Sequence, residues 1–313
     1  MKGSLNMKYA GVVVTYNRKD ELVKNIEMIL QQRSAVEMYY IVDNCSTDGT
    51  KEQLNKRGFL SPNNKIKYIR LKENIGGAGG FYIGVKAAFE DGFDCICMMD
   101  DDGRPWNDDT FYYLFNAAEK LYKTNKKLML NSLVICDKDA DKLSFGLGKM
   151  TTRDEAVMNA KDELICGLIN PFNGTLITKE LVKEIGFPNK DFFIRGDEVD
   201  YQSRARKADA LIATVVKSIY YHPTFELVPL KWKGQIVYVG TCPPWKAYYL
   251  VRNYIYRIKR DDGVVQALKE FIFQCYSTIK CNPNGKTYIH FLCKGLFDGM
   301  TGKLGMRVKP GQK

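Results

Sequence analysis

The strongest constraint on the fold is a regular alternation of strand and helix patterns through the first hundred residues. Short apolar runs of strand length alternate with longer segments in which apolar residues recur at helical spacing. The expected strands cover residues 9–15, 38–43, 66–71 and 95–99, and the expected helices lie within 19–32, 44–56 and 74–93. Such alternation predicts an α/β fold, with a mainly parallel sheet and helices on both of its faces.

Polar side chains stand at the carboxyl ends of three of these strands. Thr15 ends the first strand, Asp43 ends the second, and Asp100, Asp101 and Asp102 follow the fourth. Open α/β sheets bind ligands at this edge, so these residues are candidates for one common site. The adjacent aspartates repel one another unless a cation neutralises them, and Asp100 and Asp102 lie on the same side of an extended chain. We therefore expect these two to bind Mg²⁺ or Mn²⁺, and an exposed acidic turn is the alternative.

Three further motifs lie where a substrate could bind. A glycine-rich segment, 74–81, follows the third strand and opens a helix, which suits either phosphate binding or close packing of that helix on the sheet. Asp197 and Glu198 follow a segment, 192–196, that begins with three apolar residues and that we predict to be a strand, and one of the two is a candidate general base. His222 ends another predicted strand, where it could be structural or a third metal ligand.

Two residues could contact a nucleotide. Asp43 could accept hydrogen bonds from a ribose or a base, although an aspartate in this position often only caps the next helix. Arg18, just after the first strand, could meet a phosphate or a base through its planar guanidinium.

Positive charge is concentrated near the C-terminus. The net charge is +11, and residues 246–313 contain 13 Lys/Arg against 4 Asp/Glu in helical segments rich in aromatic residues. Nucleic acid, an anionic membrane surface or a phosphate-bearing substrate would each suit such a region. Nine scattered cysteines without zinc spacing, and no recognisable secretion signal, favour reduced thiols in the cytoplasm. No apolar run reaches the roughly 18–20 residues needed to span a bilayer.

Taken together, these motifs resemble family 2 of the inverting glycosyltransferases, whose GT-A fold is a Rossmann-like nucleotide-diphospho-sugar transferase fold. The resemblance rests on VVVTYNR at 12–18, IVDNCSTDGT at 41–50, NIGGAGGF at 74–81, MMDDDG at 98–103 and the later acidic pair. The glycine and aspartate signatures are most similar to those of bacterial galactofuranosyltransferases, with rhamnosyltransferases next. The resemblance implies transfer of galactofuranose from UDP-galactofuranose to a glycan or a polyprenyl-diphosphate-linked glycan. The alternative is transfer of rhamnose from dTDP-rhamnose.

The resemblance also implies a role for each candidate residue. Glu198, with Asp197 beside it, would be the base that activates the acceptor hydroxyl, and Asp100, Asp102 and His222 would hold Mn²⁺ or Mg²⁺ against the diphosphate. The expected nucleotide-sugar-binding residues are Thr15, Tyr16, Asn17, Arg18, Asp43, Asn74, Gly76, Gly77, Asp100 and Asp101. Within this set Asp101 points away from the two metal ligands and has no defined contact. The order Asp-Glu differs from the Glu-Asp or Asp-Asp of the family, so either member could be the base.

We expect a GT-A catalytic domain over residues 7–242, with a nucleotide-binding half at about 7–105 and an acceptor half at about 106–242. A basic, aromatic, helical subdomain would follow over 243–313. A lipid-linked acceptor would place the protein in the cytoplasm at the inner face of the membrane, with this subdomain against anionic lipids or in a homo-oligomer contact. A nucleotidyltransferase is a rival class, but the N-terminus lacks its usual glycine-rich loop. A non-enzymatic nucleic-acid-binding protein would leave the acidic strand ends unexplained, so we expect no nucleic-acid partner.

Overall fold

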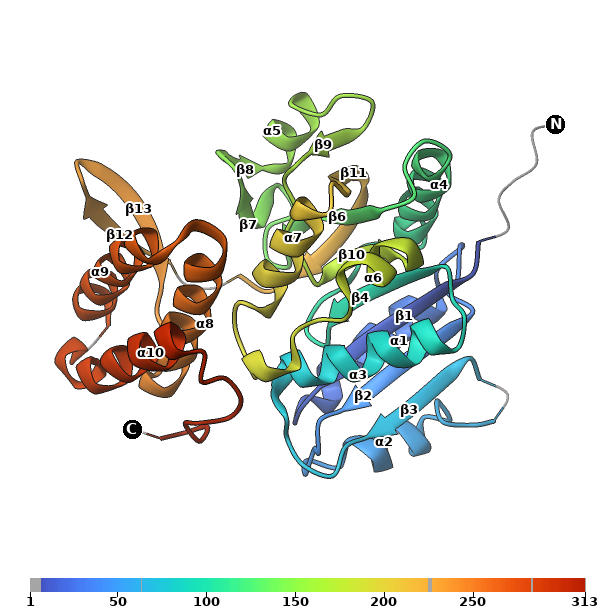
Figure 1. The fold of residues 1–313 in the computed structure, drawn as a ribbon. Helices are drawn as coiled ribbons and strands as arrows, with labels where there is room; N and C mark the ends of the chain where they lie inside the picture. The colour runs from blue at the N-terminus through green and yellow to red at the C-terminus, as the bar shows by residue number, and fades with distance from the viewer. Residues whose placement is uncertain (1–6, 63, 225–226, 283, 313) are drawn as a thin grey trace. The chain divides into compact units, whose positions relative to one another are not determined.

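The computed structural model describes residues 7–62, 64–224, 227–282 and 284–312, which form two compact units. Residues up to 74, 80–188 and 201–224 make up the first unit, and residues 75–79, 189–200 and those from 227 onward make up the second. Figure 1 shows the elements of both units. The predicted domain boundary at residue 242 remains a prediction.

A mixed sheet forms the centre of the first unit, with the strand order β3-β2-β1-β4-β10-β6-β11-β5. These strands are β1 (Tyr9–Thr15), β2 (Met38–Asp43), β3 (Ile66–Arg70), β4 (Cys95–Asp100), β5 (Arg104–Pro105), β6 (Leu128–Cys136), β10 (Asn173–Thr178) and β11 (Leu211–His222). The pairs β1–β2, β1–β4, β2–β3 and β6–β11 are parallel, whereas β10 runs antiparallel to both of its neighbours. The predicted mainly parallel sheet is therefore confirmed.

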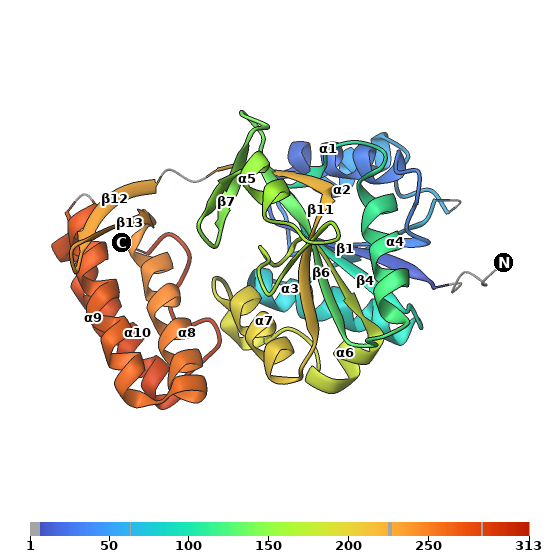
Figure 2. The same ribbon diagram turned by 90° about the horizontal axis from the view of Figure 1, so that it is seen from above.

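Helices cover both faces of this sheet, as Figure 2 shows. They are α1 (Lys19–Leu30), α2 (Thr50–Lys56), α3 (Gly76–Glu90), α4 (Thr110–Tyr122), α6 (Lys179–Ile185) and α7 (Asp197–Lys207). Val13 packs in a core with residues of α1 and α4, while its neighbours Val12 and Val14 pack in a second core with residues of α3, α6 and α7. Successive residues of a strand point to opposite faces, which is why the fully buried β1 is an unbroken apolar run.

Smaller elements lie beside the main sheet. The strands β7 (Lys142–Leu147) and β8 (Met150–Thr152) pair with each other, and β9 (Leu164–Cys166) pairs with β11. The short helix α5 (Arg153–Met158) begins with a capping box, in which the Thr152 hydroxyl accepts a hydrogen bond from the Glu155 N–H. Neither the β7–β8 pair nor α5 was singled out from the sequence, because their apolar runs are short.

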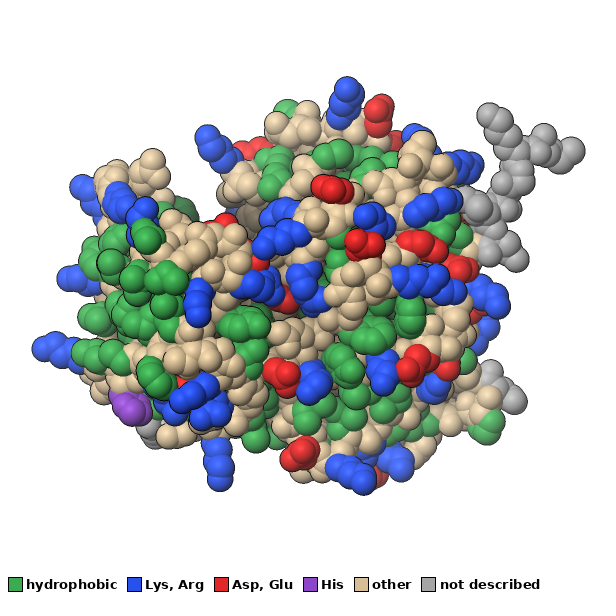
Figure 3. Space-filling view, in the orientation of Figure 1, with side chains coloured by type: hydrophobic (Ala, Val, Ile, Leu, Met, Phe, Trp, Pro, Cys, Tyr) green, Lys and Arg blue, Asp and Glu red, His purple; other side chains and the backbone are tan. Residues whose placement is uncertain are grey.

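Three helices and a hairpin account for most of the second unit. They are α8 (Pro244–Asp262), α9 (Val264–Cys281), α10 (Ile289–Thr301), β12 (Leu227–Trp232) and β13 (Gln235–Gly240), with the 3-10 turns η1 (Lys190–Phe192) and η2 (Gly285–Tyr288). This confirms the predicted helical C-terminal region. Figure 3 shows hydrophobic side chains gathered over the surface that α9 and α10 form. Across the described stretches of the chain, no helix is both long enough and apolar enough to cross a membrane.

The predicted strand at 192–196 is wrong. The segment continues from η1 into a loop, in which Phe193, Arg195 and Gly196 have positive φ angles of 64°, 68° and 81° that an extended strand does not allow. The backbone carbonyls of this loop accept hydrogen bonds from α8. The Asn253 amide donates to the carbonyls of Phe192 at 3.0 Å, Ile194 at 3.0 Å and Arg195 at 2.6 Å. Side chains distant in sequence thus take the place of a neighbouring strand.

Arg252 connects three segments of the second unit through hydrogen bonds. It is fully buried, and its guanidinium donates to the carbonyls of Phe192 at 2.7 Å, of Asp191 at 3.3 Å and of Gly305. Its Nε also donates to the Asn253 side chain at 2.8 Å. Four acceptors satisfy one buried cation, so this arginine ties the 189–195 segment and the residues after α10 to α8.

Candidate metal and donor site

Two carboxylates and one imidazole meet at the sheet edge of the first unit. Ligand atoms of Asp100, Asp102 and His222 all lie within 4.8 Å of one another. Asp100 ends β4 and His222 ends β11. The short strand β5 joins these two ends, because Arg104 pairs with the residue just before His222. The turn between β4 and β5 therefore places Asp102 beside the imidazole.

The His222 ring is held in an orientation that suits a metal ligand. Its Nδ1 lies 2.7 Å from the Pro223 carbonyl, to which a ring N–H donates, and its Nε2 faces Asp102 Oδ1 at 3.2 Å. Burial acts to lower the pKa of His222, but its hydrogen bond and attraction to Asp102 outweigh burial and raise the pKa above 6.5. Burial acts to raise the pKa of Asp102, but His222 and Arg18 lower it. In the neutral ring with Nδ1 protonated, Nε2 carries the lone pair that a metal needs.

Asp101 lies against the first strand, in accord with its expected direction away from the metal ligands. Only 6% of it is exposed, and it accepts a hydrogen bond from the Thr15 hydroxyl at 2.8 Å. Arg18 lies 3.2 Å from Asp101 and also pairs with Asp102. Burial raises the pKa of Asp101 to about 6, and the charge of Arg18 only partly opposes this. Asp101 therefore anchors Arg18 and Thr15 from within the protein.

Asp43 is a fully buried carboxylate that organises the loop after β2. The Ser46 N–H donates to its Oδ1 at 2.7 Å, the Tyr68 hydroxyl donates to its Oδ2, and Arg70 lies 3.5 Å from the same oxygen. The residue at the N-cap of α2 is Gly49, so Asp43 does not cap that helix. Tyr68 and Arg70 were not predicted to belong to this site. Their positions two residues apart near the end of β3 were the available signal.

The other residues predicted to contact the nucleotide belong to the loop after β1. Tyr16 is 45% exposed, whereas Asn17 is tied to the loop after β2. The Asn17 N–H donates to the Ser46 hydroxyl at 2.9 Å, and the Thr47 N–H donates to Asn17 Oδ1 at 2.7 Å. These bonds join two strand-end loops into one surface, on which Tyr16 and the half-exposed Arg18 remain accessible.

Most of the glycine segment serves close packing. Ideal Cβ atoms at Gly80 and Gly84 would lie 2.4 Å from Val14 and Val12 of β1. Gly76, in the second unit, has a φ of +79°, and a Cβ there would lie 1.9 Å from the Phe193 carbonyl oxygen. The exception is Gly77, where a Cβ would meet nothing within 4 Å. Close packing of the helix on the sheet thus describes Gly80 in this segment and Gly84 beyond it, whereas Gly76 packs against the Phe193 backbone and Gly77 stays open to the other role. Asn74, partly buried, ends the preceding segment of the first unit.

The acidic pair begins α7 and belongs to the second unit, whereas the aspartate–histidine cluster belongs to the first. Asp197 is 5% exposed and Glu198 is partly exposed. Burial raises the pKa of Tyr254 to about 12, and the charge of Glu198 adds to this. Of the pair, Glu198 is the more accessible to a substrate.

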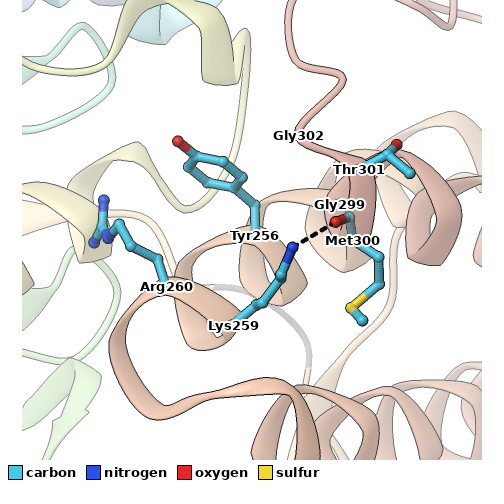
Figure 4. A pocket seen from close by; sticks show the side chains of 7 residues that line it. All are labelled: Tyr256, Lys259, Arg260, Gly299, Met300, Thr301 and Gly302. Carbon is cyan, nitrogen blue, oxygen red and sulfur yellow. Dashed lines mark hydrogen bonds between the residues drawn. The ribbon is translucent and has the colours of Figure 1, made fainter.

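A pocket of about 280 Å³ lies elsewhere in the second unit, between α8 and the end of α10 (Figure 4). Its lining residues are Tyr256, Lys259, Arg260, Gly299, Met300, Thr301 and Gly302. Lys259 donates to the Met300 carbonyl at 2.8 Å, and Arg260 pairs with Asp200 at 2.7 Å. Both cations are thus engaged within the protein, and none of the predicted site residues lines this pocket.

Comparison with known sequences gives one family. The sequence model described as Glycosyl transferase family 2 matches residues 12–125. Galactofuranosyltransferase GlfT1 of Mycobacterium tuberculosis is 31% identical over 219 residues, which cover 68% of this chain and 69% of that protein. The dTDP-rhamnosyl transferase RfbF of Shigella flexneri is 21% identical over 307 residues, which cover 96% of this chain and 98% of that protein.

Solved structures show the same architecture. S. aureus TarS 1-349 superposes with a TM-score of 0.58 at 16% identity, covering 93% of this chain and 81% of that one. The mannosyltransferase PcManGT from Pyrobaculum calidifontis, in complex with GDP-Man and Mn²⁺, superposes with a TM-score of 0.55 at 12% identity, covering 96% and 89%. These likenesses confirm the predicted GT-A fold.

Proposed function

The chain belongs to family 2 of the glycosyltransferases, and from this premise we propose that it transfers galactofuranose from UDP-galactofuranose with inversion at the anomeric carbon. The proposed acceptor is a glycan or a polyprenyl-diphosphate-linked glycan of the bacterial cell surface. The observation that carries the proposal is the meeting of Asp100, Asp102 and His222 at the strand ends. The relation to GlfT1, at 31% identity, supports the choice of donor.

The residues present fit a divalent metal of the Mn²⁺ or Mg²⁺ type. Two carboxylates and an imidazole suit Mn²⁺ in particular, and the hydrogen bond from His222 to the Pro223 carbonyl leaves Nε2 as the ligand atom. In this proposal Asp100, Asp102 and His222 hold the ion. When bound, it neutralises charge that develops on the diphosphate leaving group.

The protein's own side chains would perform the remaining steps. Glu198 takes the proton of an acceptor hydroxyl as that oxygen attacks the anomeric carbon, and the bond to UDP breaks on the opposite face of the sugar. Arg18, positioned by Asp101, lies beside the carboxylates with half of its side chain exposed, where it can meet a diphosphate oxygen. The surface that contacts the nucleotide would be formed or supported by Thr15, Tyr16, Asn17 and Asp43. The bound nucleotide-sugar would lie along Asn74, Gly76 and Gly77.

Loss of one metal ligand tests this assignment. We expect Asp102→Ala to abolish transfer from UDP-galactofuranose in the presence of Mn²⁺, because the ligand set would lose its central member. Asp108→Ala, which removes an exposed aspartate of the same region, is the matched control and should keep activity. Full activity of the Asp102→Ala variant at saturating Mn²⁺ would show that the site is misassigned.

A rhamnosyltransferase is the second candidate. The likeness to RfbF is weaker at 21% identity, but it extends over 96% of this chain, beyond the portion that GlfT1 matches. Transfer assays with UDP-galactofuranose, dTDP-rhamnose and other UDP-sugars would separate the two. Higher turnover with dTDP-rhamnose than with any UDP-sugar would replace the galactofuranose proposal.

A lipid-linked acceptor would also determine where in the cell the proposed enzyme acts. We propose that it acts in the cytoplasm, at the inner face of the membrane, with a catalytic domain over 7–242 and a C-terminal subdomain over 243–313. In this proposal the subdomain contributes contact with anionic lipids. A homo-oligomer contact is the alternative use of the same region.

A further inference from the structure

Helix α9 exposes an apolar stripe along one side. Val265, Leu268, Ile272 and Ile279 follow one another at intervals of three, four and seven residues, which places them on one face of the helix. Val265 is 68% exposed and Ile272 is 59% exposed. Ala267, on the opposite side, is buried. Globular proteins normally turn such a stripe inward, so its exposure calls for a partner.

The neighbouring hairpin exposes further apolar side chains. Trp232, on the inner face of the hairpin, packs against Phe273 and Tyr276 of α9, with ring centroids 5.4 and 5.1 Å apart. The other face of the hairpin exposes Ile236 at 68% and Tyr238 at 67%. We call Val265, Leu268, Ile272, Ile279, Ile236 and Tyr238 the apolar surface. Hydrophobic side chains are interspersed with Lys and Arg over this part of the molecule in Figure 3.

The whole excess of positive charge lies in the same part of the sequence. Residues 227–313 contain 15 Lys/Arg and 4 Asp/Glu, whereas residues 1–226 contain 32 of each. Lys269 and Lys280 belong to α9 itself, and Lys231 and Lys233 belong to the hairpin. Among the described residues, no ion pair within 4.0 Å involves any of these four lysines. Their charge is therefore available to an external anion.

Of the basic, aromatic helical segments near the C-terminus, α8 is not the one whose apolar side chains are exposed. Tyr248 and Tyr249 of α8 are fully buried, and Arg252 of the same helix serves the carbonyls described above. A surface contact through this region must therefore use other residues. The apolar surface on α9 and the hairpin supplies them.

From these observations we infer that the apolar surface docks on an anionic lipid bilayer. Aliphatic and tyrosine side chains would enter the interface, while the four lysines meet lipid headgroups. A second copy of the chain would bring the same lysines against one another, which disfavours self-association. Nucleic acid would use the lysines but offers no partner for the exposed Val265, Leu268 and Ile272. The inference deepens the proposed function, since it places the enzyme where a lipid-linked acceptor lies.

Vesicle binding tests the inference without any sugar or metal, so its failure is distinct from failure of the proposed activity. The full chain would be co-sedimented at low salt with vesicles of phosphatidylcholine containing phosphatidylglycerol, and with vesicles of phosphatidylcholine alone. We expect binding to the anionic vesicles, at least about tenfold weaker binding to the neutral ones, and release by salt. Absence of binding to the anionic vesicles at low salt would overturn the inference.

Surface variants locate the contact. Leu268→Glu with Ile272→Glu should weaken binding by at least about tenfold, and Lys269→Ala with Lys280→Ala by about 30-fold. Val157→Glu with Met158→Glu, which adds the same two charges at exposed apolar residues of α5, is the matched control and should bind like wild type. Unchanged vesicle binding by the Leu268/Ile272 variant would show that the apolar surface is not the membrane contact. So would a wild-type dimer that this variant dissociates in sedimentation without any vesicle binding.

Discussion

Exchanging each of two adjacent glycines for alanine separates the two roles of the glycine segment. Gly76→Ala adds a Cβ that, with φ at +79°, would lie 1.9 Å from the Phe193 carbonyl oxygen and 2.5 Å from its carbon. Gly77→Ala adds the same methyl group where nothing lies within 4 Å. The two variants share chemistry and differ by one position, so each controls for the other.

The structure sets the size of the difference. A left-handed backbone costs an alanine about 1–2 kcal/mol. The overlap with backbone atoms of Phe193 cannot be relieved by turning a side chain, so the loop itself must shift, at about 2–3 kcal/mol more. We therefore expect Gly76→Ala to lower the free energy of unfolding by roughly 3–5 kcal/mol. Gly77→Ala lies in the first turn of α3 and should change it by no more than about 1 kcal/mol, in the stabilising direction.

Urea unfolding of both variants followed by circular dichroism measures this difference, and calorimetric titration with UDP-galactofuranose in Mn²⁺ measures donor binding. If the open space at Gly77 admits the nucleotide-sugar, Gly77→Ala should weaken donor binding while it keeps stability. Equal stability of the two variants would refute the packing argument for Gly76. Unchanged binding of the full nucleotide-sugar by Gly77→Ala would remove that residue from the donor site.

Three further predictions concern charged side chains. Arg252→Met should lower the free energy of unfolding in urea by about 3–5 kcal/mol, because it removes the hydrogen bonds that join the 189–195 segment and Gly305 to α8; a loss below about 1 kcal/mol would contradict this role. Glu198→Gln should reduce turnover more than Asp197→Asn in a steady-state transfer assay, and the reverse order would make Asp197 the base. The raised pKa of His222 means that a proton competes with Mn²⁺ at Nε2. Mn²⁺ affinity should therefore fall as pH drops through this pKa and rise above it, and calorimetric titrations that show no pH dependence would exclude His222 as a ligand.

The strands and helices of the first hundred residues were predictable because local pattern and tertiary role agree there. Met38–Asp43 is a strand in the structure as in the sequence, because a fully buried parallel strand is an unbroken apolar run. The segment 192–196 begins with three apolar residues but forms a loop, since its hydrogen-bond partners are Arg252 and Asn253, about sixty residues away. The sequence of the segment itself does not indicate that these residues are its partners. Its only local sign is Gly196, which adopts a positive φ.

Candidate site residues were predictable where they stand at strand ends, and less so where one side chain holds another. Asp43 and the aspartate triplet could be chosen as candidates simply because they stand at the ends of β2 and β4. Tyr68 and Arg70 could not be chosen in this way, because only the register of β3 against β2 brings them to Asp43. The burial of Asp101 depends likewise on Thr15, a residue 86 positions earlier. Such supporting contacts require the folded sheet.

The aspartate triplet, which suggested a metal, turns out to have a second source of positive charge. Arg18 pairs with Asp101 and Asp102, and His222 gains positive charge as its pKa rises, so the repulsion among the carboxylates is already opposed by side chains. Acidic residues in sequence are therefore insufficient evidence for a metal here. The stronger argument is the imidazole, whose Nδ1 is turned to the Pro223 carbonyl while Nε2 faces the carboxylates. A histidine needed only as a cation could form its ion pair through either nitrogen, whereas a metal ligand needs one nitrogen fixed as donor and the other directed at the site.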